Sequence, residues 1–424
     1  MTVKVRSLVA RARRLAALDL QAVGIRPQDL PYAPTPAHFA AANARLAEID
    51  GAVRRQLEEL TREVSDPSLR PDAVLAHAAL VEREVDRARR AFGLFFDLFS
   101  QRGSRFAPAL AACDVIAADC FAALRKGLPG LLPPVLVKPL TYLEHSFSPA
   151  TFRRGVLLRR LLGERNPFPL VRVPYEHVES PWGFGVLLHE LGHNLQAESG
   201  VWQETEAAVQ ARVLRLTRDP WLTRVWGRFH KECFADLIAL LLGGPAAARS
   251  MKEFLAYPAA RVLSFRPLGV HPPPYLRAFL LAEMLRRMGF AAEAGRIEAS
   301  WRGLYGQAAS RGRLPPALLR TAAEVIPHVV DEIAWQPRRG LAQHALADVV
   351  TYRPADELAV QRAAREIGRG RLPDNLPARF AVSASRVAFE RRLAPPASIA
   401  RTVLSCLAAR AASRRTSEAQ RAAA

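Results

Sequence analysis

Apolar and polar positions alternate along most of this chain with the period of an α-helix. Between 38 and 64, apolar side chains recur at steps of three and four residues, which places them on one face of a helix. A break containing two Pro residues separates this stretch from a second one, 72–101, and the pair predicts an antiparallel helical hairpin. A third helix is expected at 106–126, ending where Gly and Pro become frequent.

The same period continues in the second half of the chain, where it predicts several more helices. Their expected ranges are 275–290, 315–335, 355–368, 377–393 and 397–412. Both ends of the chain lack a clear pattern. Residues 1–30 are interpreted as a basic, weakly ordered leader, and the polar, Ala-rich residues 413–424 as a disordered tail.

Strand-like segments are confined to the Pro-rich residues 130–180. The clearest are 135–137 and 169–178, which are rich in β-branched residues. Pro cannot donate a ladder hydrogen bond, so the Pro residues of 169–178 favour a strand at the edge of a sheet. The expected fold class is therefore mostly α-helical with a small antiparallel sheet (α+β). The expected organisation is an N-terminal helical region (1–130), a central core (131–300) and a C-terminal helical region (301–412).

The segment 185–196 carries a motif that can bind a metal, formed by His189, Glu190 and His193 within an apolar helical stretch. Residues four apart lie one above the other on a helix, so the two imidazoles can bind one ion from the same face. Zinc is the ion that this HExxH spacing indicates, and Glu190 can then reach a water on the metal. Two ordinary histidines on a core helix are the alternative.

A catalytic zinc site needs a third protein ligand, and the segment 230–245 offers one. Glu232 and Asp236 are again four residues apart in an apolar stretch. Glu232 can complete a His₂Glu set, and Asp236 can accept a hydrogen bond from the second ring nitrogen of a ligating histidine. A solvated acid pair at a helix start is the alternative. His230 and Cys233 are rival donors, but neither shares a helical face with both acids.

This arrangement resembles the gluzincin zinc peptidases, the thermolysin-like class in which HExxH is followed downstream by ExxxD. The metzincin class is excluded, because it requires Gly and His where this chain has Gln196 and Ser199. The resemblance covers residues 165–290 and implies a zincin-like catalytic core, with one Zn²⁺, in the central region. The positions that match are His189, Glu190, His193, Glu232 and Asp236.

A further stretch, 269–277, is similar to the His-Pro…Arg element that follows the third ligand in heat-shock-type membrane zinc peptidases. A Pro-stiffened loop after the ligand helix can overhang the metal, where a developing oxyanion needs an electrophile besides zinc. His271, Tyr275 and Arg277 are the candidates for this role. The alternative is that His271 and the neighbouring prolines form a tight turn between two helices.

Together these groups predict the hydrolysis of a peptide bond. Zinc polarises the scissile carbonyl and lowers the pKa of its bound water. Glu190 is expected to act as general base on that water and to carry the proton to the leaving amine. Gluzincins hold an extended substrate along an edge strand through backbone hydrogen bonds, and 169–178 is the expected strand in this chain.

Charge and composition limit the other function classes. The formal net charge is +20 at pH 7, carried almost wholly by Arg residues that are scattered along the chain and accompany no nucleic-acid-binding motif. Nucleic acid is therefore not favoured as a partner, and a peptide or protein substrate is expected. An inactive zinc-binding scaffold and an Arg-rich nucleic-acid-associated protein remain as alternatives.

Cysteine usage and hydropathy bear on the compartment. Four Cys residues without a CxxC pair argue against both a disulfide framework and a Cys zinc site. The N-terminal residues lack the uninterrupted apolar core of a signal peptide, and the chain has no uninterrupted run of 18 apolar residues. These features predict a cytoplasmic protein with no membrane span.

Overall fold

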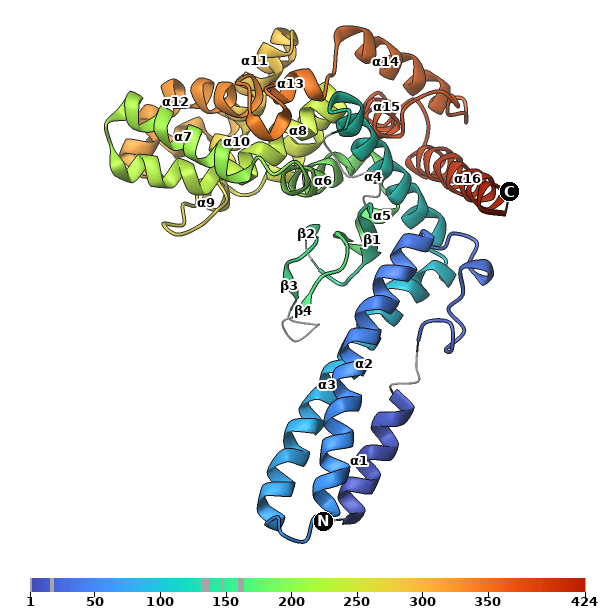
Figure 1. Cartoon of the computed structure of the whole chain (residues 1–424). Coiled ribbons are helices and arrows are strands. Elements are labelled where there is room, and N and C mark those ends of the chain that lie inside the picture. The colour runs from blue at the N-terminus through green and yellow to red at the C-terminus, as the bar shows by residue number, and fades with distance from the viewer. Residues whose placement is uncertain (1, 16–18, 131–136, 147, 159–163, 424) are drawn as a thin grey trace. The chain divides into compact units, whose positions relative to one another are not determined.

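Figure 1 shows the computed structural model of the chain, coloured from its N-terminus to its C-terminus. The structure describes all residues except 1, 16–18, 131–136, 147, 159–163 and 424. The chain divides into two compact units. The first unit comprises Met1–Leu110, Phe152–Leu170 and Ala411–Ala424, and the second comprises Ala111–Thr151 and Val171–Arg410.

The first unit contains the predicted helical hairpin. Its arms are α2 (Pro36–Val64) and α3 (Pro71–Ser100), which pack side by side (Figure 1). Each helix starts with Pro, whose missing N–H costs no hydrogen bond at that position. Phe95 and Phe99 of α3 are fully buried near Phe168. Phe95 and Phe99 therefore contribute to the core of this unit, whereas Phe96 is exposed.

The prediction of a weakly ordered leader at 1–30 is wrong for its first half. Thr2–Leu15 forms helix α1, which packs on α2 and α3. Its buried face consists of Val5, Leu8 and Ala12, spaced by three and four residues. Five basic residues interrupt this apolar series in the sequence, but all of them are exposed on the other side of the helix. The segment is therefore an amphipathic helix rather than a disordered leader.

The part of the chain between α4 (Ala107–Gly127) and the HExxH helix forms a three-stranded sheet. Its strand order is β1-β5-β2, with β1 at Leu140–Leu143, β5 at Leu170–Val173 and β2 at Ala150–Phe152. The sheet is mixed, which corrects the expected antiparallel sheet. Both connections to β5 exceed the dozen or so residues that a parallel pairing requires, so the chain can enter the sheet in either direction.

A separate two-stranded ladder lies between β2 and β5 in the sequence. Here β3 (Leu157–Leu158) pairs antiparallel with β4 (Glu164–Arg165).

The predicted edge strand at 169–178 is also wrong. Only Leu170–Val173 is extended, and this strand lies in the middle of its sheet. Tyr175–Val178 forms a short helix, α5, directly after Pro174. Pro cannot continue a hydrogen-bonded ladder but is tolerated where a helix begins, so Pro174 ends the strand. The other expected strand, 135–137, lies almost wholly outside the described residues.

The second unit is almost entirely helical. It holds the expected core, 131–300, apart from Phe152–Leu170, and nearly all of the expected C-terminal region, 301–412. A helical content of 71% confirms the mostly α-helical fold class. The main helices are α6 (Gly185–Glu198), α7 (Trp202–Thr217), α8 (Pro220–Leu255), α10 (Pro274–Arg287), α11 (Ala291–Ser310), α12 (Pro316–Ala334), α14 (Pro354–Gly368), α15 (Ala378–Glu390) and α16 (Pro396–Ala423). Two short helices are α9 (Ala259–Val262) and α13 (Leu346–Val349).

The predicted disordered tail at 413–424 is a further correction. Helix α16 continues to Ala423, so the backbone of nearly the whole tail is helical. Ala and Arg have high helix propensity, and they extend a helix whose earlier turns are packed. Polar, Ala-rich composition alone therefore does not distinguish a disordered tail from the end of a long helix.

Helix α8 is the centre of the second unit, since α6, α7, α10, α12 and α15 all pack on it. Helix α6 crosses it closely at Gly192. A Cβ atom at this position would lie 2.6 Å from Ile238 Cγ2 and 3.0 Å from Ala235 Cα. Gly therefore permits the close approach of the two helices, and this approach brings the motif of α6 against the acids of α8.

Two helices, α4 and α8, are long and apolar enough to cross a membrane by length and composition. This is weak evidence, because the core helices of globular proteins pass the same test, and 94% of the apolar window of α8 is buried. The absence of a membrane span and the cytoplasmic location stay predictions.

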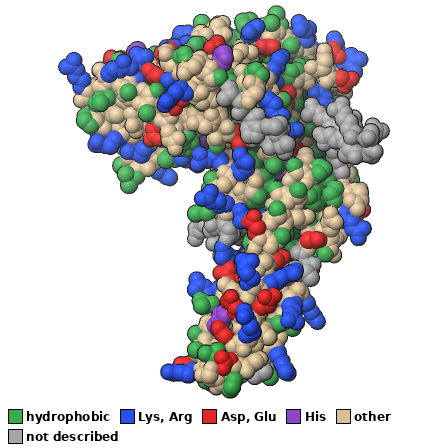
Figure 2. Space-filling model, in the orientation of Figure 1, with side chains coloured by type: hydrophobic (Ala, Val, Ile, Leu, Met, Phe, Trp, Pro, Cys, Tyr) green, Lys and Arg blue, Asp and Glu red, His purple; other side chains and the backbone are tan. Residues whose placement is uncertain are grey.

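Lys and Arg side chains are spread over the visible face of the molecule rather than gathered in one patch (Figure 2). This distribution agrees with the scatter of Arg along the sequence.

Candidate metal centre

The three metal donors expected from the sequence lie together where α6 meets α8. His189 and His193 lie one turn apart on α6 with ring centroids 4.9 Å apart, and Glu232 faces them from α8. One donor atom from each residue lies within 4.8 Å of the other two. Glu232 spans the two imidazoles, because its Oε2 is 3.4 Å from His189 Nε2 and its Oε1 is 3.6 Å from His193 Nε2.

These separations fit a single ion bound by all three side chains. Zinc–ligand bonds are about 2.0–2.2 Å long, so the donors of a tetrahedral ion lie roughly 3.4 Å apart. The contacts of His189 and His193 with Glu232, 3.4 and 3.6 Å, are of this length, and each is made to a different oxygen of the carboxylate. Two imidazoles and one carboxylate also leave one position open, as in catalytic zinc sites. The group can therefore hold a metal ion, and the identity of that ion stays a prediction.

Asp236 orients the first histidine, as expected for an outer carboxylate. It is fully buried, and its Oδ1 lies 2.8 Å from His189 Nδ1. Since one ring nitrogen of His189 is engaged by Asp236, the other is directed toward Glu232 and the donor group. Asp236 thus fixes which nitrogen of His189 is offered to a metal.

Arg277 of α10 holds the same carboxylate from the opposite side. Its Nη2 donates to Asp236 Oδ1 at 2.6 Å, and its Nε donates to Asp236 Oδ2 at 2.8 Å. This is a bidentate pair between two buried side chains, the geometry in which Arg binds carboxylates most specifically. The expected oxyanion role of Arg277 finds no support here, because the guanidinium is turned to Asp236. Its observed contact is with the carboxylate that faces His189.

Burial and charge shift the pKa values of this cluster in opposite directions. Burial alone would lower the pKa of His189, but Asp236 and then Glu232 raise it to about 9. Burial would raise the pKa of Glu232, yet hydrogen bonds from both histidines hold it well below its usual value. Burial likewise opposes ionisation of Asp236, whose pKa is lowered by the charge of Arg277. The buried carboxylates and histidines therefore stabilise one another's charged forms, and Arg277 balances the charge of Asp236.

Glu190, the expected general base, lies next to the donors and is 9% exposed. Its backbone carbonyl accepts a hydrogen bond from Thr151 Oγ1 at 2.8 Å, which connects α6 to strand β2. In the order β1-β5-β2, strand β2 is one of the two edge strands, so an edge of the sheet lies beside the motif helix. Nothing in the sequence around Thr151 indicates this contact.

His271 reaches the donor group from the loop between α9 and α10. Its Nε2 lies 3.4 Å from Glu232 Oε2, and its side chain is 67% exposed. The loop is anchored to α8, because Arg228 Nη2 donates to the carbonyl of Pro267 at 2.6 Å. His271 therefore places an exposed imidazole beside Glu232, and its catalytic role stays a prediction.

Tyr275 is not brought to the donors. It lines a separate cavity of about 370 Å³ that also involves α11 and α12, and its ring packs edge-on against Phe279 at 5.1 Å. Tyr275 is the second residue of α10. The turn of the helix directs its side chain away from the loop that carries His271. Of the three candidates for the oxyanion role, the structure brings only His271 to the donor group.

The rival donors of α8 are engaged elsewhere. His230 Nδ1 donates to the carbonyl of Gly227 at 2.6 Å, and the ring lies edge-on to Trp202. Cys233 is fully buried, and burial together with nearby carboxylates raises the pKa of its thiol. A protonated thiol is a poor metal ligand, so neither residue competes with Glu232.

Two buried amides on α6 lie near the centre and have no strong signal in the sequence. Asn194 and Gln196 are 1% and 0% exposed, and neither side chain has a hydrogen-bond partner among the residues that the structure describes. Asn194 follows Glu190 by four residues, and Gln196 follows His193 by three, so each shares a helical face with a motif residue. Buried amides rarely lack partners, which makes both further candidates for functional residues.

The class that this geometry defines is a helical protein with a buried His₂Glu metal-binding group on two crossing helices. Comparison with protein-family models, with curated proteins and with solved structures gave no match to the chain. The relation to gluzincins therefore rests on the motif residues and stays a hypothesis.

Proposed function

We propose that this chain is a zinc-dependent metallopeptidase of the gluzincin type. The supporting observation is the group of His189, His193 and Glu232, whose donor atoms lie within 4.8 Å of one another and whose ligand types suit a zinc ion with one open position. Asp236 adds the outer carboxylate that catalytic zinc sites use to orient a histidine. Zinc fits this donor set better than the hard cations, which bind mainly oxygen ligands.

Glu190 is the residue that moves the proton in this proposal. A zinc ion in the group supplies Lewis acidity, which polarises a carbonyl and makes a water more acidic. The Glu190 carboxylate removes a proton from the attacking water and delivers it to the nitrogen of the leaving amine. Glu190 is adjacent to His189 but is not one of the three donors, so it is free to carry that proton.

His271 is the electrophile that this proposal assigns to the carbonyl oxygen. Its ring nitrogen lies beside Glu232 at the exposed side of the donor group, where a substrate would enter. An imidazole N–H in that place can donate to the oxygen as negative charge develops on it. Arg277 is excluded from this role by its bidentate bond to Asp236.

The substrate class that fits is an extended peptide bound along β2. This strand is an edge of its sheet, and Thr151 joins it directly to the backbone of Glu190. Edge strands offer unpaired backbone N–H and C=O groups, to which an extended peptide can bind as an added strand. The substrate strand proposed here is therefore Ala150–Phe152 instead of 169–178.

The test is the variant Glu190→Gln, measured for zinc content and for cleavage of an unfolded protein. Gln keeps the size of the side chain but cannot accept the proton, so activity should fall at least about 10²-fold. Zinc content should stay at the wild-type level, because Glu190 is not a donor. Glu198→Gln, on the same helix but outside the motif, is the matched control and should remain active.

The possible results separate the proposal from its alternatives. Full activity in Glu190→Gln would remove Glu190 from the mechanism. Wild-type protein with zinc but without cleavage of any peptide in a library would favour a zinc-binding scaffold.

A further inference from the structure

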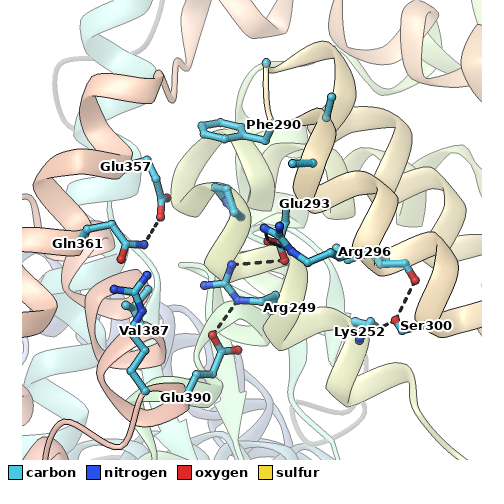
Figure 3. A pocket seen from close by; sticks show the side chains of 16 residues that line it. Arg249, Lys252, Phe290, Glu293, Arg296, Ser300, Glu357, Gln361, Val387 and Glu390 are labelled. Atoms are coloured by element: carbon cyan, nitrogen blue, oxygen red, sulfur yellow. Dashed lines mark hydrogen bonds and ion pairs between the residues drawn. The ribbon is translucent and has the colours of Figure 1, made fainter.

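A second cavity, of about 800 Å³, lies in the same unit as the metal donors (Figure 3). Its walls are the last turns of α8, the start of α11, and parts of α14 and α15. None of the metal donors lines it. The cavity is therefore a separate place where a small molecule can bind.

Three carboxylates line this cavity, and each is already bound by neighbouring side chains. Arg249 lies between Glu293, at 3.4 Å, and Glu390, at 2.8 Å (Figure 3). Tyr352 and Gln361 both donate hydrogen bonds to the third carboxylate, Glu357.

The cations of the lining outnumber these carboxylates by one, and two of the four have no acidic partner. Lys252 Nζ donates to Ser300 Oγ at 2.9 Å and pairs with no carboxylate among the described residues. Arg391 is exposed and has no ion pair within the part of the chain that the structure describes. An ammonium offers three donors and a guanidinium five, so both retain donors for a ligand. The cations are Arg249, Lys252, Arg296 and Arg391.

The first turn of α11 adds further donors to the same wall. Ala291 and Ala292 line the cavity, and the N-cap residue Phe290 provides no side-chain cap. The first backbone N–H groups of a helix have no partner within it, and the helix dipole makes this end positive. The ring of Phe290 also lines the cavity and provides an apolar surface for the organic part of a ligand (Figure 3).

One buried acceptor in the lining lacks a donor. Gln361 Oε1 is inaccessible to solvent and has no hydrogen-bond partner, while the amide nitrogen of the same side chain is bound to Glu357. Because this oxygen is closed off from solvent, a ligand in the cavity does not reach it, and the features that favour a ligand are the unpaired cations and the helix end.

We propose that this cavity binds a small organic phosphate and that its occupant regulates the metal centre. A phosphate carries between one and two negative charges near neutral pH, which matches the two unpaired cations and the positive helix end. The organic remainder of such a molecule would pack on Phe290. Binding to the cavity does not depend on the proposed peptidase function.

The cavity wall touches the start of the metal-binding helix. Ser250 lies between the two cavity residues Arg249 and Lys252, and its Oγ donates to the carbonyl of Gly183 at 3.2 Å. A Cβ atom at Gly185, where α6 begins, would lie 2.6 Å from Ser250 Cβ. The α8 segment that binds the ligand and the α6 segment that precedes the motif are therefore in direct contact.

A second contact links the cavity to the break in α8. Gly244 has φ 60° and ψ −151°, so the helix is interrupted between its metal-binding half and its cavity half. The Tyr352 ring packs against Gly244 so closely that a Cβ atom there would overlap it, and its hydroxyl donates to Glu357 at 2.6 Å. A ligand that alters Glu357 or Arg249 can thus shift one half of α8 relative to the other.

The first experiment titrates the full-length protein with adenosine 5′-monophosphate by calorimetry at constant ionic strength. The variant Lys252→Gln/Arg391→Gln removes both unpaired cations and should weaken binding at least about tenfold, since each charged hydrogen bond contributes more than 1 kcal/mol. The matched control, Arg311→Gln/Arg313→Gln, removes the same charge just beyond the opposite end of α11 and should bind as the wild type does. Circular dichroism checks that all three proteins are folded.

Equal weakening of nucleotide binding in both double variants would mean that the general positive charge of the chain causes the effect. That result would overturn the proposed site. The absence of saturable binding in the wild type would do the same.

The second experiment measures zinc affinity with and without adenosine 5′-monophosphate in wild type and in Lys252→Gln/Arg391→Gln. The nucleotide is expected to change the zinc affinity of the wild type only. The same result in the wild type and in the double variant would overturn the proposed regulation. Protein that binds the nucleotide but no zinc would leave the phosphate site intact and contradict both the peptidase function and the regulation of a metal centre.

Discussion

Asp236 is the single residue on which the orientation of the donor set depends most. It is fully buried, lies 2.8 Å from His189 Nδ1, and is held by two hydrogen bonds from Arg277. A buried carboxylate is stable only where such partners compensate its lost hydration. The pair of Asp236 and Arg277 therefore keeps His189 ready for a metal before any metal binds.

Replacing Asp236 by Ala should weaken zinc binding about 10- to 100-fold, because His189 loses the contact that selects its ring nitrogen. Competition with a chromophoric chelator measures this affinity. Cys233→Ala changes a buried residue on the same helix that is not a donor, and it should retain the wild-type affinity. Equal affinity in Asp236→Ala and wild type would mean that Asp236 has no part in metal binding.

The sequence could predict the donors and Asp236, because the spacing of four residues places side chains on one helical face without knowledge of the fold. It could not predict that Arg277 binds Asp236, since 41 residues separate them and the contact depends on how α10 packs on α8. For the same reason, His271 and Tyr275 could not be distinguished from the sequence. Both belong to one Pro-rich element, and only its path shows which side chain reaches Glu232.

The crossing of α6 and α8 is the element-level feature that assembles the site. Gly192 lies inside the motif, between Glu190 and His193, and its missing side chain lets α6 contact the backbone of α8. A helix packed this closely should respond to a single added methyl group.

Gly192→Ala is expected to destabilise the protein by about 1–3 kcal/mol, the usual cost of overpacking a core, and to weaken zinc binding by separating the helices. Gly303→Ala is the matched control, since Gly303 lies on the exposed side of α11 with nothing within 4 Å of its added Cβ. That control should be stabilised by up to about 1 kcal/mol. Urea denaturation measures both, and a Gly192→Ala variant as stable as Gly303→Ala would contradict the close crossing.

Helices were more predictable than strands in this chain. The hairpin of α2 and α3 follows from apolar spacing alone, because each helix buries one face. The place of β5 in the sheet depends on its neighbours, which are strands separated from it by long connections. Pro174 was consistent with an edge strand, but in the structure it begins a helix. Helix α1 and the end of α16 beyond residue 412 were missed, because basic or polar residues mask their pattern.

For the whole molecule, the metal should stabilise one unit more than the other. All three donors lie in the second unit, on helices that form its centre. A ligand that binds only the folded state adds free energy of unfolding, about 4 kcal/mol at a thousand times its Kd.

Removal of zinc with a chelator, followed by dialysis, should therefore lower the thermal transition of the second unit and leave that of the first unaffected. Differential scanning calorimetry of the zinc-bound and zinc-free protein resolves the two, and added zinc should restore the higher transition. Identical traces with and without zinc would show that no metal contributes to the stability of this unit.

The central claim is that His189, His193 and Glu232 bind one zinc ion, and metal analysis of purified protein tests it most directly. Wild type and Glu190→Gln should each contain one zinc per chain, whereas Glu232→Ala should lose it, because two imidazoles alone leave the site incomplete. Circular dichroism confirms that Glu232→Ala remains folded. Substoichiometric metal in the wild type, or full zinc content in Glu232→Ala, would contradict the claim.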